Sequence, residues 1–145
     1  MKVKNNKAFT LIEVLLVIAI IAVLAAAVFV AINPAKNISD ARNTQRRSDV
    51  TQILNAISQG FIDNVTLSGV PTCALVPAGT HIGTGVGLVN ASALVPTYIA
   101  GIPMDPQGGT AADTGYSICT TAVAPVRYKV FAANPENGVT ISVER

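Results

Sequence analysis

An uninterrupted apolar run stands out in the hydrophobic pattern of the first third of the chain. Val14 to Ile32 are 19 consecutive residues without a polar side chain. At about 1.5 Å per residue, a helix of this length spans roughly 28 Å, close to the hydrocarbon thickness of a bilayer. The run predicts either a transmembrane anchor or the core of a secretory signal, for which Ala25–Ala27 would supply the small residues of a cleavage site.

A carboxylate at the start of this run, Glu13, changes its interpretation. An acidic side chain in a membrane costs about 2.5–3.5 kcal/mol on insertion scales, which ordinary anchors and secretory signals avoid. A cut between Ala8 and Phe9 would create an α-amino group with a pKa of about 8, largely cationic at neutral pH. Residues 9 and 13 are one helical turn apart, so a neighbouring helix shifted by one turn could set its amine against this carboxylate. The pattern therefore indicates that Glu13 sets the register of an assembly.

The segment Lys7-Ala8-Phe9-Thr10-Leu11-Ile12-Glu13-Val14 resembles the N-terminal signal of type IV pilins and pseudopilins. In that family a prepilin peptidase removes a short basic leader and N-methylates the new first residue. A glutamate near the new terminus then guides subunits into a helical filament. The resemblance implies cleavage between Ala8 and Phe9, N-methylation of Phe9 and a filament-assembly role for Glu13. The family usually has glycine where this chain has Ala8.

A second periodic segment follows Asn33-Pro34, where proline removes a backbone hydrogen bond and disfavours helix at the residue before it. Beyond this point apolar residues recur at helical spacing, while polar residues fall mostly elsewhere on the helix. The pattern predicts an amphipathic helix from about Ala35 to Ile62. Its apolar positions are Ile38, Ala41, Val50, Ile53, Leu54, Ile57 and Phe61.

The C-terminal end alternates with the period of a β-strand. Two alternating segments, Val126–Ala132 and Val139–Glu144, flank a turn cluster at Asn134–Gly138 and predict a β-hairpin. Tyr116–Thr120 predicts a third strand. One apolar face of such a sheet can cover the apolar stripe of the preceding helix. The sequence thus predicts an α+β fold in which a long N-terminal helix packs on a small antiparallel sheet, the arrangement that the resemblance to pilins also implies.

Composition and charge exclude several classes of protein. Half of the residues are apolar and only 12% are charged, which excludes a disordered acidic or basic tail. Three lysines in the first eight residues supply the excess of the +2 net charge, so the remaining chain carries seven cations and eight anions. This balance argues against a nucleic-acid-binding protein.

The two cysteines, Cys73 and Cys119, match no zinc-binding spacing. If the C-terminal part is exported, we expect them to form a disulfide that stabilises the fold by about 4 kcal/mol, and that closes a surface loop as in pilins. The alternative is two separate buried thiols in a reducing compartment.

The other candidate sites are interpreted as structural. We interpret His81 as a surface residue, Arg46 and Arg47 as part of a solvated helix face or a filament contact, and Asp105 as the cap of a proline-rigidified turn. The glycine-rich stretch Gly83–Gly87 departs from the dinucleotide-binding pattern because leucine takes the place of the third glycine. No nucleophile has a partnered base, so we predict no enzymatic activity, no cofactor and no metal.

These patterns predict four segments: a leader at residues 1–8, a transmembrane or filament-core half-helix at 9–33, an amphipathic half-helix at 34–62 and a globular part at 63–145. We predict the precursor of a structural subunit of a type IV pilus or pilus-like filament. It would be a single-pass protein of the cytoplasmic membrane before assembly and part of an extracellular or periplasmic filament afterwards. The expected partners are further copies and other pilins, prepilin peptidase, the inner-membrane assembly machinery and lipid, without a small-molecule substrate or nucleic acid.

Three alternatives stay open at this point. The chain could be a pseudopilin of a type II secretion or competence system. It could be a secreted soluble protein cut after Ala27, or a tethered sensor or enzyme that keeps Met1. Mass spectrometry of the mature N-terminus distinguishes the last two from a prepilin.

Overall fold

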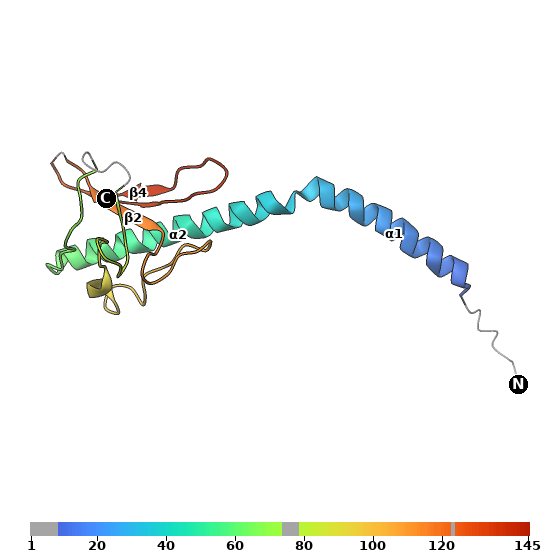
Figure 1. Cartoon of the computed structure of the whole chain (residues 1–145), viewed down its shortest axis with the longest axis horizontal. Helices are drawn as coiled ribbons and strands as arrows, with labels where there is room; N and C mark the ends of the chain where they lie inside the picture. Colours follow the sequence, from blue (N-terminus) through green and yellow to red (C-terminus); the bar gives the residue numbers. More distant parts are fainter. Residues whose placement is uncertain (1–8, 74–78, 123) are drawn as a thin grey trace, which may run out of the picture. The chain divides into compact units, whose positions relative to one another are not determined.

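A computed structural model describes residues 9–73, 79–122 and 124–145 (Figure 1). The chain divides into two compact units, Met1–Asn37 and Ile38–Arg145, which are called the N-terminal and C-terminal units below. The N-terminal unit contains helix α1, and the C-terminal unit contains most of helix α2 and a four-stranded sheet.

Helix α1 spans Leu11–Ile32, and none of its residues is buried. It is the one helix in the described part of the chain that is long and apolar enough to cross a membrane. A helix that is apolar on all sides needs cover from lipid or protein on all sides. The predicted apolar half-helix is therefore present, and the described residues of the chain bury none of its side chains.

The predicted interruption between the two helices lies at Asn33. This residue is left-handed, with φ 46° and ψ 73°, and α2 begins directly after it at Pro34 and ends at Ile62. Proline suits the first position of a helix because its missing N–H would have no helical partner there. The side chain of Asn33 accepts a hydrogen bond from the Lys36 N–H at 3.3 Å, and that of Asn37 donates to the carbonyl of Ile32 at 3.0 Å. Side chains thus satisfy backbone groups on both sides of the break.

The sheet is antiparallel throughout, in the order β1-β2-β3-β4. The strands are β1 (Thr80–His81), β2 (Tyr116–Thr120), β3 (Tyr128–Ala132) and β4 (Ser142–Glu144), and a short 3-10 helix, η1, spans Ser92–Leu94. The predicted third strand and hairpin are both confirmed. The hairpin connection, residues 133–141, is longer than the turn cluster predicted, because the second strand begins only at Ser142.

The hydrophobic core lies between α2 and one face of the sheet, and Figure 1 shows β2 drawn beside α2. Its fully buried members include Val50 and Ile53 of α2, Ile118 of β2 and Val130 of β3. Ile118 lies opposite Val130 in the β2–β3 register, which brings both side chains to the same face. The predicted α+β fold, a long N-terminal helical region with a small antiparallel sheet, is confirmed.

The prediction that the apolar stripe of α2 is covered is wrong at both ends of the stripe. Ile38 is 54% exposed and Phe61 59% exposed. Phe61 makes an edge-to-face contact with Tyr128, with ring centroids 6.2 Å apart. Apolar packing of α2 is thus concentrated between Val50 and Ile57.

Candidate functional site

The first turn of α1 holds the residues that the sequence marks for processing and assembly. Thr10 is the N-cap of the helix, with the extended backbone angles φ −80° and ψ 150°. Its hydroxyl accepts a hydrogen bond from the Glu13 N–H at 3.3 Å. In return Oε2 of Glu13 accepts hydrogen bonds from the N–H of Thr10 at 3.2 Å and from its hydroxyl at 3.1 Å. This reciprocal arrangement is a capping box.

The capping box satisfies two backbone N–H groups at the end of the helix, and it places a carboxylate where the helix dipole favours negative charge. Within residues 9–73, 79–122 and 124–145, no ion pair involves Glu13. Phe9 precedes the cap and is 83% exposed. An exposed aromatic residue and a carboxylate without an ion pair among the described residues therefore lie one turn apart.

The structure places Phe9 and Glu13 together at this helix end, while Ala8 lies outside the described residues. Cleavage, methylation and assembly at these positions remain predictions. Thr10 was not among the predicted site residues, although the spacing Thr-x-x-Glu before an apolar run is the signature of a capping box. Glu13, predicted to bind an amine of another chain, contacts the hydroxyl and N–H of Thr10, three residues away.

The other two predicted site residues, Cys73 and Cys119, are joined by a disulfide with Cα atoms 5.1 Å apart. Cys119 belongs to β2, and the N–H of Cys73 donates to the carbonyl of Thr120 at 2.8 Å. The bridge and this hydrogen bond hold Cys73 against the end of β2. The predicted pairing is confirmed.

A buried cluster of charges in the C-terminal unit centres on Arg46. The side chain of Arg46 is fully buried, and it binds Asp105 with two parallel hydrogen bonds, Nε to Oδ2 at 2.6 Å and Nη2 to Oδ1 at 2.9 Å. Its remaining donors reach Asn43 Oδ1 at 3.0 Å, Glu136 Oε2 at 2.9 Å and Gln107 Oε1 at 3.4 Å. All five guanidinium donors therefore have acceptors, as burial of a charge requires.

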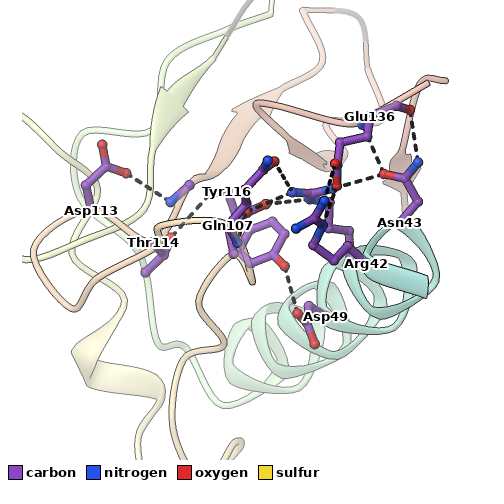
Figure 2. A network of polar contacts seen from close by, with 11 residues as sticks. Arg42, Asn43, Asp49, Gln107, Asp113, Thr114, Tyr116 and Glu136 are labelled. Carbon is purple, nitrogen blue, oxygen red and sulfur yellow. Dashed lines mark hydrogen bonds and ion pairs between the residues drawn. The ribbon is translucent and has the colours of Figure 1, made fainter. Parts of the chain in front are cut away.

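Glu136 connects this cluster to the loop between β3 and β4 (Figure 2). Its carboxylate also receives two hydrogen bonds from Arg42, at 2.8 and 2.7 Å. Its backbone N–H and carbonyl are both bound by the side-chain amide of Asn43, at 3.0 and 2.9 Å. Two guanidinium groups and two carboxylates thus balance in charge and fasten two loops to α2.

The charges of the cluster shift its pKa values. Burial alone would raise the pKa of Asp105, but the hydrogen bonds from Arg46 and from the Gln107 N–H, together with the charge of Arg46, lower it overall. Hydrogen bonds from Arg46 and Arg42 lower the pKa of Glu136. The pKa of Arg46 is raised, chiefly by its hydrogen bond to Asp105. All three groups are charged over the whole neutral range.

A second buried polar contact lies one turn further along α2. The hydroxyl of Tyr116 donates to Oδ2 of Asp49 at 2.7 Å, and both residues are buried. Burial, followed by the hydrogen bond to Asp49, raises the pKa of Tyr116 well above its usual value.

The interpretation of Arg46 as part of a solvated face or a filament contact is wrong, whereas Arg47 is exposed. The signal was present in the spacing, because residues 43, 46, 50, 53 and 57 form one continuous helical stripe. The predicted capping role of Asp105 is confirmed, since its Oδ1 accepts a hydrogen bond from the Gln107 N–H at 2.8 Å.

The remaining candidates contact other groups of the chain. His81 is partly exposed, and its Nδ1 lies 2.9 Å from a carboxylate oxygen of Asp113. The N–H groups of Gly83, Thr84 and Gly85 donate to backbone carbonyls of the chain itself and are not available to a phosphate. Among the residues that the structure describes, no group of three or more His, Cys, Asp or Glu side chains could hold a metal ion.

Comparison with protein-family models matches residues 3–29 to the prokaryotic N-terminal methylation motif. This motif is the signal of type IV pilins and pseudopilins, and it marks structural pilin-like subunits rather than enzymes. No curated protein and no solved structure matches the chain. The match covers residues 3–8 of the predicted leader, the capping box and most of α1, so the motif includes the first turn described above.

Proposed function

We propose that this chain is the precursor of a structural subunit of a type IV pilus or pilus-like filament. A peptidase would cut it between Ala8 and Phe9 and methylate the new amine of Phe9. The mature subunit would then enter a filament in which apolar helices such as α1 pack against one another. The observation that carries this proposal is the methylation motif over residues 3–29, joined to a helix whose apolar surface is exposed along its whole length.

The apolar surface of α1 suits both surroundings that this proposal requires, which are lipid before assembly and a filament core afterwards. Such a helix is stable in lipid, and it is equally stable when other apolar helices surround it. Lipid can hold the precursor, and a filament core can replace the lipid without exposing apolar surface to water. The proposed localisation therefore begins in the cytoplasmic membrane and ends in a filament outside it.

Glu13 would select the position at which a subunit joins the filament. Its carboxylate forms hydrogen bonds with Thr10 and has no cationic partner in the described part of the chain. The α-amino group that cleavage creates on another copy would supply that partner. In a low-dielectric setting such a pair is worth more than in water, so a subunit at the wrong depth would be disfavoured.

Mass spectrometry of the mature protein tests the processing step. We expect the first residue to be N-methyl-phenylalanine, corresponding to Phe9. A chain that still begins with Met1 would indicate a permanent tether, and a chain that begins near Val28 would indicate an ordinary secretory signal. Either result would overturn the proposal.

A pair of variants tests the assembly step. Glu13→Gln keeps the size of the side chain and its ability to accept a hydrogen bond from Thr10, but it removes the charge. We expect Glu13→Gln and Glu13→Ala to give few or irregular filaments in electron micrographs, and we expect Glu13→Gln, which keeps the acceptor for the Thr10 N–H, to be cleaved normally. Normal filaments from Glu13→Gln would show that the charge of this residue has no part in assembly.

A further inference from the structure

We propose that Thr10 is a positioning residue for leader removal: its N-cap fixes the start of α1 and keeps the backbone next to the cleaved bond out of the helix. This inference rests on the proposed cut between Ala8 and Phe9. It concerns the backbone conformation of the substrate chain at the cut, and it assigns no role to residues of the peptidase.

The geometry places the helix start two residues after the proposed cut. Helix α1 begins at Leu11, and Thr10 has extended backbone angles. Phe9 belongs to no helix or strand and is 83% exposed. The Phe9 side of the bond is therefore non-helical and open to another molecule.

Thr10 supplies the helix-stop signal in this part of the sequence. Residues 1–10 contain no glycine or proline, and Ala8 is the residue type with the highest helix propensity. The apolar helix that follows would readily continue toward the leader. In a continued helix the N–H of Thr10 would bind the carbonyl four residues earlier. In the structure the N–H of Thr10 donates to Glu13 Oε2 instead, and the Thr10 hydroxyl accepts a hydrogen bond from the N–H of Glu13.

Hydrolysis needs access to the bond. One water molecule is consumed as the C–N bond between Ala8 and Phe9 breaks, which leaves a carboxylate on Ala8 and an α-amino group on Phe9. Within a helix the carbonyl of Ala8 would be hydrogen-bonded to the N–H of Ile12, and proteolysis favours exposed backbone outside such structure. Any population of chains with a longer helix reduces the observed rate in proportion, because only the open form is cut.

The test compares Thr10→Val and Thr10→Ser with the wild type as full-length precursors in detergent micelles, cut by purified prepilin peptidase. Valine has the shape of threonine without a hydroxyl, whereas serine keeps the cap. We expect kcat/KM for Thr10→Val to fall by up to about five-fold, the limit set when the loss of about 1 kcal/mol typical of an N-cap shifts the ratio of open to extended chains five-fold. Thr10→Ser should be cut at nearly the wild-type rate.

Amide hydrogen exchange of Phe9 and Thr10 in the same micelles separates positioning from a general effect on the protein. We expect slower exchange in Thr10→Val because the helix extends, and wild-type exchange in Thr10→Ser. Equal cleavage of Thr10→Val and the wild type would overturn the inference, as would slow cleavage without slower exchange, or slow cleavage of Thr10→Ser. If the wild-type chain is not cut between Ala8 and Phe9, the proposed function itself fails.

Discussion

Replacing Arg46 with methionine should strongly destabilise the C-terminal unit. Methionine keeps an unbranched apolar side chain but removes all five donors that Arg46 places in the buried cluster. Asp105, whose side chain is 7% exposed, would lose the guanidinium that binds both of its carboxylate oxygens, and it would remain buried. Removing one member of a buried ion pair typically costs about 3–5 kcal/mol of unfolding free energy, much of it from the charge left behind.

The double variant Arg46→Met, Asp105→Leu sharpens this prediction. Because it removes both charges of the pair, Asp105 no longer leaves a carboxylate buried without its partner, and we expect the double variant to recover a large part of the lost stability. Glu136 keeps two hydrogen bonds from Arg42 in both variants, so the loop that carries it should stay on α2. A double variant as unstable as Arg46→Met would show that shape, and not the stranded charge, determines the cost.

Urea unfolding of the full chain in a mild detergent, followed by tyrosine fluorescence, is the appropriate assay. All three tyrosines lie in the C-terminal unit and the chain has no tryptophan, so the signal reports on that unit alone. Arg47→Met is the matched control, because Arg47 is the next residue, has the same chemistry and is exposed. We expect the control to change stability by no more than about 0.5 kcal/mol. Similar losses from Arg46→Met and Arg47→Met would refute the reasoning.

Three further predictions follow from the described contacts. The lowered pKa values of Asp105 and Glu136 give stability that is present above about pH 4 and lost as the pH falls through the lowered values; urea unfolding from about pH 5 to pH 2 should show the loss, reduced in Glu136→Gln. The raised pKa of Tyr116 gives stability that is present below about pH 10 and lost as the pH rises further, and Tyr116→Phe should lessen this alkaline loss in the same assay. Cys73→Ser should lower the melting temperature under oxidising conditions by the equivalent of about 4 kcal/mol; an unchanged value would argue against a stabilising bridge.

Much of the fold could be predicted from the sequence because its signals are local. The apolar run before Asn33, the helical period after it and the alternation in Tyr116–Thr120 each lie within one element. Such periods depend on which face of an element is buried, and they give the element's type and approximate bounds. Phe61 fits the helical period but is 59% exposed, and its ring contacts Tyr128 at the start of β3.

The buried cluster could not be predicted in the same way. The partners of Arg46 are 59 and 90 residues away along the chain, at Asp105 and Glu136. A charged residue on an apolar stripe is usually solvated unless it is paired, and local periodicity contains no information about a distant pair. The sequence therefore favoured the wrong environment for Arg46 while giving the correct turn at Asp105.

The capping box is an intermediate case, because its residues are local but the sequence also suggests another role for them. Glu13 caps its own helix through Thr10, whereas the sequence pattern favoured a partner in another chain. The proposed assembly role is compatible with the cap, since both contacts with Thr10 end on one carboxylate oxygen, Oε2.

The uniform side-chain chemistry of α1 has a consequence for how the helix can be oriented. Polar groups occur only near its two ends, at Thr10 and Glu13 and at Asn33. Sliding the helix along its axis would move those groups into oil or apolar groups into water, so its depth is well defined. In lipid, turning it about that axis exchanges one apolar surface for another at little cost. A preferred direction of rotation in lipid must therefore come from contacts outside residues 14–32, or from packing against another helix.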